Sequence, residues 1–257
     1  MKQPHILAIG SFAVHGTASL KTFISVLGEK ILPVPSLLLN GLTNMGLVKK
    51  FEPPFDELLK STIELAEFRK LDLVLYIGYL GNANQVDGIL EVIEQYRPLI
   101  KTIIIDPVCG DHGRKYVPDT VIARWPELIV LADMAFPNIT ELKILTNNAP
   151  DAEVELDWLK LQFEIKYPKT KLIITSITTD DDNIGFEVTG DKGFTYMHAL
   201  LPKNYGGTGD AFLALFLLDY FYKNKAFENA LKLAADQTFT LIENSIGVAS
   251  DDLIIEL

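Results

Sequence analysis

The sequence predicts a three-layer α/β/α domain whose central sheet is mostly parallel and ends in an antiparallel edge hairpin. Short, continuously apolar runs alternate with longer segments whose apolar residues recur every three or four positions. This alternation is typical of parallel strands joined by crossover helices. After residue 180 the pattern changes, and two β-rich runs flank the turn residues Gly190, Asp191, Lys192 and Gly193. Such a turn favours a hairpin at the edge of the sheet.

Six segments before the hairpin have the pattern of buried strands. Most are apolar without alternation, as expected for strands that are covered on both faces. Pro33 and Pro35 place the second strand toward an edge or make its start irregular, because proline has no N–H for the ladder. The predicted strands are residues 5–11, 30–39, 71–78, 101–106, 127–138 and 171–176.

The remaining segments have helical spacing or follow the hairpin as long apolar stretches. No internal repeat, low-complexity tract or Ser/Gly linker interrupts them, so we expect a single domain over residues 1–257. The predicted helices are residues 53–70, 84–100, 139–150 and 151–167, with two long helices near 207–223 and 226–247.

Composition excludes several classes of function. The chain has 257 residues with 23 Lys and Arg against 34 Asp and Glu, a formal charge of −11, which disfavours coating of nucleic acid. One cysteine permits no internal disulfide and favours a reducing compartment. The N-terminal residues lack a signal-peptide pattern. The apolar stretch 211–222 is too short to span a bilayer. We therefore expect a soluble cytoplasmic protein with no nucleic-acid or membrane partner.

Polar and glycine residues follow the predicted strands at the ends where ligands collect in open parallel sheets. Ser11 follows the first strand and Tyr79 the third. The segment 106–111 follows the fourth, 137–141 follows the fifth, and Thr175 and Ser176 end the sixth. We expect these residues to share one rim of the sheet.

The strongest local signal is the turn from Gly206 to Asp210, which opens an apolar helix. Its glycines permit close approach of the backbone to a ligand, and the unpaired N–H groups of a first helical turn suit a phosphate. Asp210 would stand near enough to accept a proton from a substrate hydroxyl. The alternative is a tight turn in which Asp210 caps the helix. No lysine follows the glycines, so this is not the GxxxxGK[ST] nucleotide loop.

Five motifs in this order, GYLG, DPVCGDHGRKYVPD, PNITELKILT, TS and GGTGDAF, resemble those of pyridoxal kinases in the ribokinase-like superfamily. The resemblance is dense from about residue 70 to 146 and returns at 171–176 and 206–214. It implies a ribokinase-like fold and ATP-dependent phosphorylation of the hydroxymethyl group of pyridoxal, pyridoxine or pyridoxamine. It also implies a homodimer.

The resemblance assigns the phosphate-transfer residues by matching position. Asp210 would be the catalytic base and would also contact the substrate hydroxyl, and Gly207, Thr208 and Gly209 would form the anion hole for the transferred phosphate. Glu141, with the help of Asn138, would hold Mg²⁺ largely through water, which fits the preference of that ion for oxygen ligands. The alternative for Glu141 is a surface charge in the first turn of a helix.

Other residues match positions around the nucleotide. Asp106 and Asp111 would line the nucleotide phosphates and the cation, with a monovalent cation as a further candidate beside Mg²⁺. Thr175 and Ser176 would contact the nucleotide, and Tyr116 would act as a lid-like residue near the phosphates. Asp106 could equally cap the end of its strand.

On the substrate side, Ser11 and Tyr79 match residues that bind the pyridine ring, and Thr43 matches a threonine that follows a ring-contacting histidine. Here Leu42 occupies the histidine position, and Met45 replaces an aromatic residue. These departures leave open pyridoxal and other pyridine or pyrimidine alcohols as substrates.

Two other functions compete with this interpretation. A hydroxymethylpyrimidine kinase shares the fold, but such enzymes usually carry a Gly-Gly-Ala-Gly run that residues 16–20 lack. A non-catalytic, vitamer-binding regulatory protein would agree with the departures at Leu42 and Met45. Against it, Asp210 and the pair Asn138 and Glu141 are all present, and a protein without catalysis has no chemical need of them.

Overall fold

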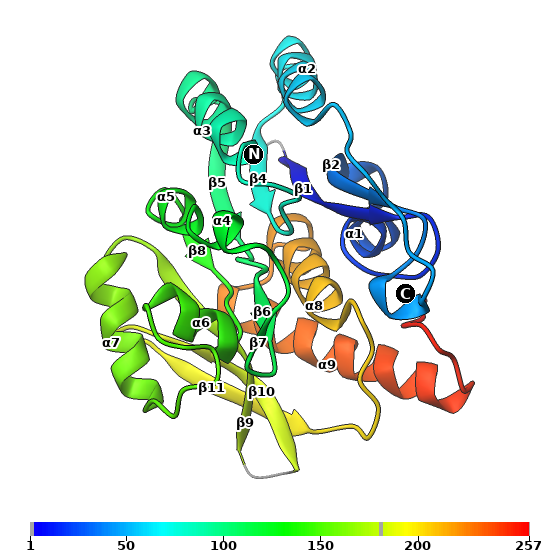
Figure 1. The fold of residues 1–257 in the computed structure, drawn as a ribbon, viewed down its shortest axis with the longest axis vertical. Coiled ribbons are helices and arrows are strands. Elements are labelled where there is room, and N and C mark those ends of the chain that lie inside the picture. Colours follow the sequence, from blue (N-terminus) through cyan, green and yellow to red (C-terminus); the bar gives the residue numbers. More distant parts are fainter. Residues whose placement is uncertain (1–2, 180–181, 257) are drawn as a thin grey trace.

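The computed structural model describes residues 3–179 and 182–256 and confirms the predicted fold class, with a central sheet covered by helices on both faces (Figure 1). The strands of this sheet are β1 (His5–Ala13), β2 (Ile31–Leu39), β3 (Lys50–Phe51), β4 (Leu73–Ile77), β5 (Ile100–Ile105), β8 (Met134–Ala135), β9 (Lys171–Thr179), β10 (Asn183–Val188) and β11 (Phe194–Ala199). A separate small hairpin is formed by β6 (Gly110–Asp111) and β7 (Arg114–Lys115).

The order of strands across the sheet is β11-β10-β9-β8-β5-β4-β1-β2-β3. The six strands from β9 to β2 run parallel, whereas β10 and β11 form the predicted antiparallel hairpin. At the other edge, β3 pairs antiparallel with Leu38 and Leu39 of β2. Pro33 and Pro35 lie outside this pairing and stand opposite Ala8 and Gly10 of β1.

Helices cover the two faces of the sheet (Figure 1). One core contains side chains from α2, α3, α5, α6 and α7, and the other contains side chains from α1, α8 and α9. The helices are α1 (Leu20–Leu27), α2 (Phe55–Phe68), α3 (Gln85–Tyr96), α4 (Asp119–Ile122), α5 (Trp125–Ile129), α6 (Ile139–Leu145), α7 (Leu156–Lys166), α8 (Thr208–Leu217) and α9 (Phe227–Gly247).

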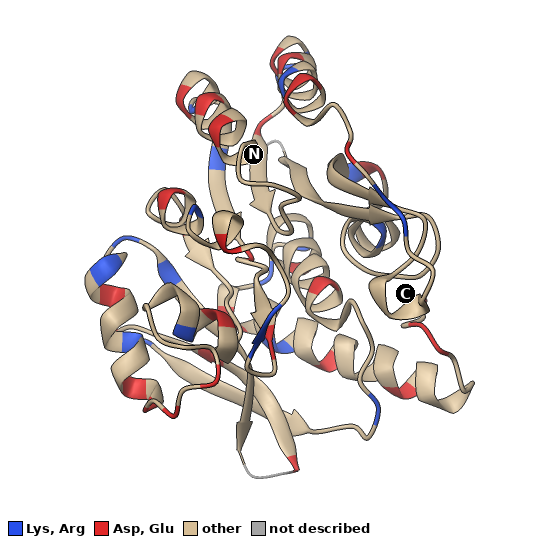
Figure 2. Cartoon of the chain, viewed as in Figure 1, with Lys and Arg blue, Asp and Glu red and all other residues tan. Residues whose placement is uncertain are grey.

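The central strands divide their side chains between these two cores. In β1, Leu7 and Ile9 enter one core, and Ile6 and Ala8 enter the other. Because successive side chains of a strand point to opposite faces, a continuous apolar run can fill both cores at once. Charged residues lie mainly on the helices and loops around the sheet (Figure 2).

The segment 127–138 differs from the sequence-based prediction of one long strand. Its first residues belong to α5, where Leu128 and Ile129 are fully buried against the sheet. Only Met134–Ala135 pairs with neighbouring strands, as β8 between β5 and β9. Pro126 explains the difference, because proline is well suited to the first turn of a helix. The short helix α1 was not predicted at all.

The apolar helix near 207–223 is also shorter than predicted. The α-helical part, α8, ends at Leu217, and a π-helical segment continues over Leu218–Tyr222. Asp219 in this segment is buried and bonded to Lys223 and Gln237. No helix among the described residues combines the length and the apolar composition that crossing a membrane would require.

Candidate active site

A cavity of about 640 Å³ lies where the parallel strands end, and it contains every residue that the sequence predicts for the site. Strand ends, the start of α6 and the start of α8 all contribute to its wall. The predicted residues that line it are Ser11, Thr43, Tyr79, Asp106, Asp111, Tyr116, Asn138, Glu141, Thr175, Ser176, Gly207, Thr208, Gly209 and Asp210. Distant parts of the chain thus meet in one place, as the topology of a parallel sheet requires.

The glycine turn places the first turn of α8 against this cavity. Gly207 is the N-cap of α8 and has a φ of 88°. A Cβ atom at this position would lie 2.5 Å from the carbonyl oxygen of Thr17, so only glycine fits without a shift of the backbone. The free N–H groups of the first turn that follows are suited to a phosphate.

Asp210 does not cap the helix, because Gly207 occupies that position. The carboxylate of Asp210 is half-buried and accepts a hydrogen bond of 2.8 Å from the backbone N–H of Ser19. Burial raises the pKa of Asp210 above its ordinary value, and the bond from Ser19 opposes this effect. A carboxylate with a raised pKa is a stronger base, as proton abstraction from a hydroxyl requires.

Asp106 stands at the end of β5 and faces the same cavity. Burial and the charge of Asp210 raise its pKa to about 8. The hydroxyl of Tyr76 donates a hydrogen bond of 3.3 Å to Asp106, which favours the charged form but does not offset the other two effects. Two carboxylates that repel each other across a cavity form a site that attracts cations.

Asn138 and Glu141 form a capping box at the start of α6. The side chain of Asn138 accepts a bond of 2.9 Å from the Glu141 N–H, and Glu141 accepts one of 3.0 Å from the Asn138 N–H. The other carboxylate oxygen of Glu141 accepts a bond of 3.0 Å from the N–H of Cys109. Glu141 is 2% exposed, so it is not the surface charge that the alternative interpretation assumed.

The donor set at this end of the cavity suits Mg²⁺. Asp106, Asp111 and Glu141 supply carboxylate oxygens, but the described residues contain no cluster of three or more metal-binding side chains. Mg²⁺ keeps several waters and commonly binds one or two carboxylates together with substrate phosphates, so it does not need such a cluster. Burial and the nearby charge of Asp106 raise the pKa of Glu141, and the backbone hydrogen bonds from Cys109 and Asn138 oppose this rise.

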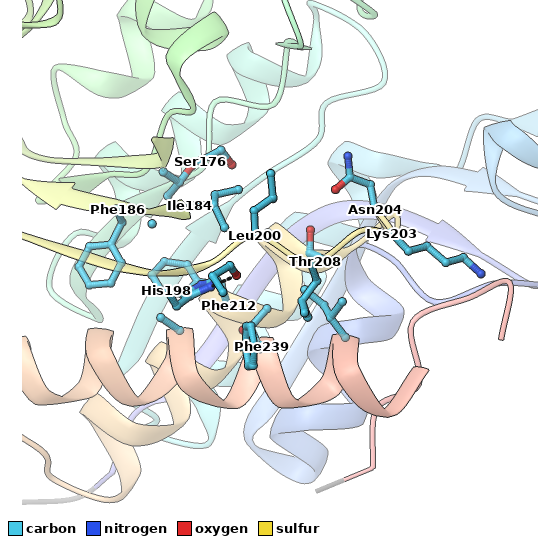
Figure 3. Close-up of a pocket in the computed structure, with 18 residues that line it drawn as sticks. Ser176, Ile184, Phe186, His198, Leu200, Lys203, Asn204, Thr208, Phe212 and Phe239 are labelled. Atoms are coloured by element: carbon cyan, nitrogen blue, oxygen red, sulfur yellow. Dashed lines mark hydrogen bonds between the residues drawn. The ribbon is translucent and has the colours of Figure 1, made fainter. Parts of the chain in front are cut away.

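A second, smaller cavity of about 140 Å³ adjoins the first and shares Thr175, Ser176, Thr208, Gly209 and Phe212 with it (Figure 3). Its wall is mostly apolar and is built from β10, β11 and the segment after it, α8 and α9. Sequence reasoning missed the residues from β10, β11, the segment after β11 and α9, because they form no motif and come from separate elements. They include Ile184, Phe186, His198, Leu200, Lys203, Asn204, Phe239 and Ile242.

The opposite end of the main cavity is formed by the ends of β1 and β2 and the loop that follows β2. Leu37, Leu39 and Leu42 give it an apolar wall, and Ser11 and Thr43 contribute hydroxyl groups. Tyr79 is half-buried here, and burial raises the pKa of its phenol, which keeps it neutral. A flat, mostly apolar ring with a few polar substituents would fit such a wall.

The α/β fold, with a glycine-capped helix start beside a half-buried carboxylate, is the arrangement expected of a kinase of small molecules. Residues 43–254 match the phosphomethylpyrimidine kinase family. The chain is 30% identical to the pyridoxal kinase of Arabidopsis thaliana over 227 residues, which cover 82% of this chain and 72% of that protein. It is 26% identical to the pyridoxal kinase of Dictyostelium discoideum over 241 residues, covering 84% and 78% of the two chains.

Solved structures show the same fold. The pyridoxal kinase of Entamoeba histolytica superposes with a TM-score of 0.84 at 22% identity, covering 97% of this chain and 92% of that one. The pyridoxal kinase of Lactobacillus plantarum gives a TM-score of 0.83 at 21% identity, covering 98% and 92%. The chain therefore belongs to the phosphomethylpyrimidine kinase family of the ribokinase-like superfamily, among its pyridoxal kinases. It is an enzyme, contrary to the alternative of a non-catalytic regulatory protein.

Proposed function

We propose that this protein transfers the terminal phosphate of ATP to the hydroxymethyl group of pyridoxal, pyridoxine or pyridoxamine. The observation that carries the proposal is that the turn from Gly207 to Asp210 lies in the main cavity, which has an apolar wall at one end and adjoins the smaller apolar cavity. Phosphoryl transfer needs two substrates placed end to end, and this arrangement supplies a place for each.

Asp210 accepts the proton of the substrate hydroxyl as its oxygen attacks the terminal phosphorus of ATP. The bond from that phosphorus to the bridging oxygen breaks, and ADP leaves. The N–H groups of Thr208, Gly209 and the residues after them stabilise the negative charge on the transferred group. Because the first turn of α8 holds both the base and these donors, one short segment aligns the reacting atoms.

Asp106, Asp111 and Glu141 would hold Mg²⁺, largely through water, with Asn138 orienting Glu141 through the capping box. Bound there, the ion neutralises charge on the phosphates of ATP. No arginine is among the described residues that line the cavity, so the N–H groups at the start of α8 and a divalent cation held by the carboxylates would bind these phosphates.

Thr175 and Ser176 lie where the two cavities join and would contact the nucleotide between its phosphates and its base. The apolar slot lined by Phe186, Leu200 and Phe239 would hold the base (Figure 3). Tyr116, which is 54% exposed, stands on the open side of the main cavity and would cover the phosphates. ADP in the solved pyridoxal kinase of Leishmania donovani supports the use of ATP here.

A pyrimidine alcohol is a second candidate substrate. The family that the chain matches is described by phosphomethylpyrimidine kinase activity. Leu42, at the position where a ring-contacting histidine is expected, lines the cavity with an apolar side chain that does not select a pyridine ring. Initial rates with pyridoxal, pyridoxine, pyridoxamine and hydroxymethylpyrimidine will rank the two classes.

We also propose that the protein is cytoplasmic and that it assembles as a homodimer. The apolar early segment 26–39 is a candidate interface. Val26, Leu27, Val34 and Leu39 are buried within the subunit, whereas Pro33 is exposed and Leu32 and Leu38 are partly exposed. Sedimentation velocity across a range of protein concentrations measures the oligomeric state.

The first test of this function is Asp210→Asn. We expect the variant to fold normally and to lose about 100- to 10,000-fold in kcat, because the amide cannot accept the proton. The exposed Asp191→Asn in the hairpin turn is the matched control and should retain full turnover. Near wild-type kcat in Asp210→Asn would assign the base to another group.

A further inference from the structure

Lys50 is the one cationic side chain among the described residues that line the main cavity. Four carboxylates line the same cavity, those of Asp106, Asp111, Glu141 and Asp210. The proposed function assigns a role to each carboxylate but none to Lys50. Lys50 is exposed in the ligand-free protein, so its ammonium group needs no counter-ion within the protein and is accessible to a ligand in the cavity.

The pairing of strands directs Lys50 into the cavity. Lys50 lies opposite Leu39 in the antiparallel pair of β3 and β2. Leu37 lies opposite Ser11, and Leu39 opposite Ala13, in the parallel pair of β2 and β1. Because residues opposite each other share a face of the sheet, Lys50, Leu39 and Leu37 stand on the face that carries Ser11. All of these except Ala13 line the cavity.

The same topology separates Lys50 from the phosphate end. Asp106 follows β5, and β3 lies four strand positions away, across β4, β1 and β2. Neighbouring strands are about 4.8 Å apart, so the two backbones are roughly 19 Å apart across the sheet. A lysine side chain does not cover that distance. Lys50 therefore belongs to the ring end of the cavity, with Ser11 and Thr43.

No ion pair or side-chain hydrogen bond engages Lys50 within residues 3–179 and 182–256. Asp106 lies at the other end of the cavity, and the apolar wall of Leu37, Leu39 and Leu42 offers no acceptor. The ammonium group is thus free to bind an anionic oxygen of the ligand.

We propose that Lys50 binds the ionised ring oxygen of a 3-hydroxypyridine and thereby selects pyridine alcohols over aminopyrimidine alcohols. The inference rests on the proposed function and names the substrate class that the same site prefers. The ring hydroxyl of pyridoxal loses its proton readily, because the protonated ring nitrogen stabilises the resulting phenolate. Hydroxymethylpyrimidine carries an amino group beside its hydroxymethyl group, and that donor cannot accept a hydrogen bond from an ammonium.

The test is Lys50→Met, which keeps the unbranched stem and removes the charge. Binding without ATP is measured by titration calorimetry with pyridoxine and with 3-deoxypyridoxine, its analogue that lacks the ring oxygen. We expect the Kd for pyridoxine to rise roughly tenfold, as for a lost bond to a charged group, and the Kd for 3-deoxypyridoxine to stay the same. The Kd for hydroxymethylpyrimidine should not rise, and the KM for ATP should not change.

Lys49→Met is the matched control, because Lys49 precedes Lys50 and does not line the cavity. Its Kd values should equal those of the wild type. Equal pyridoxine affinity in Lys50→Met and wild type would overturn the inference while leaving phosphorylation intact. An equal rise in the Kd for pyridoxine and in the Kd for 3-deoxypyridoxine in Lys50→Met would also overturn the inference, since the ring oxygen would then not be the partner of Lys50. Failure of the wild type to phosphorylate any pyridine alcohol would instead refute the proposed function.

Discussion

The carboxylate of Glu141 has two roles, because it joins two backbone segments and is also a proposed ligand of Mg²⁺. Both of its oxygens accept backbone hydrogen bonds, from Cys109 and from Asn138, and so tie the loop after β5 to the start of α6. The same side chain lines the cavity at the proposed Mg²⁺ site. A buried carboxylate that binds two backbone N–H groups keeps a fixed orientation, which a cation site requires.

Glu141→Gln should separate these roles. The amide retains one acceptor oxygen but turns the other into a donor that faces a backbone N–H, so we expect a loss of about 1–3 kcal/mol in the free energy of unfolding. The Mg²⁺ concentration for half-maximal activity should also rise, because the charge is removed from the cation site. Chemical denaturation measures the first effect, and a Mg²⁺ titration of initial rate the second. The exposed Glu64→Gln is the control for both. An unchanged Mg²⁺ requirement would move the metal role to Asp106 and Asp111.

At the scale of elements, the start of α8 depends on close contact with the loop before α1. At Gly207 a Cβ atom would lie 2.5 Å from Thr17 O and 3.0 Å from Ala18 Cα. The next residue of that loop, Ser19, donates its N–H to Asp210. A shift of this loop would therefore disturb Asp210, the proposed base, as well as the proposed anion site.

Gly207→Ala should reduce both stability and turnover. The positive φ and the contact with Thr17 together predict a loss of about 1–3 kcal/mol in the free energy of unfolding. Gly209→Ala is the comparison for stability, because a Cβ atom there meets nothing within 4 Å and alanine favours a helix. We expect Gly209→Ala to unfold at the same temperature as wild type or higher. A Gly207→Ala protein as stable as Gly209→Ala would show that the loop adapts freely.

Strands whose whole apolar run favours one type of secondary structure could be predicted from the sequence. Segments whose apolar run covers both a helix and a strand could not. The apolar runs at 71–78 and 101–106 became β4 and β5, because nothing in them favours a turn or a helix. In 127–138 the apolar run spans a helix end and a two-residue strand, and apolar content does not distinguish the two. The boundary depends on how α5 packs on the sheet, which is a property of the tertiary structure.

The candidate site divides in the same way. Asp210 and Asn138 lie in motifs, and the order of these motifs along the chain allowed both residues to be assigned to one site. Lys50 and Phe239 line the cavities but belong to no motif. Lys50 reaches its cavity through the pairing of β3 with β2, and a two-residue strand leaves no periodic signal in the sequence.

At the scale of the whole molecule, the active site lowers the stability of the ligand-free protein at neutral pH. Asp106 ordinarily has a pKa of 3.8, and in the folded protein burial and the charge of Asp210 raise it to about 8. The pKa values of Glu141 and Asp210 are raised as well, mainly by burial. Between pH 4 and 8 the folded protein thus retains protons that the unfolded chain releases. Stability must then fall as pH rises through this range, because the unfolded state binds fewer protons.

Asp106→Asn removes the carboxyl group whose pKa is raised from 3.8 to about 8. We expect the variant and the wild type to have similar Tm values near pH 4, where Asp106 is neutral in the folded protein. The variant should melt several degrees higher near pH 8, because an amide stays neutral and can still accept the bond from Tyr76. Its catalytic rate should fall, which is the trade-off expected where function requires buried charge. Scanning calorimetry from pH 4 to 8 without nucleotide or Mg²⁺ measures the difference, and the exposed Asp191→Asn should show none. A Tm difference that does not grow with pH would mean that Asp106 is already charged in the folded protein at pH 4, and that Tyr76 outweighs burial.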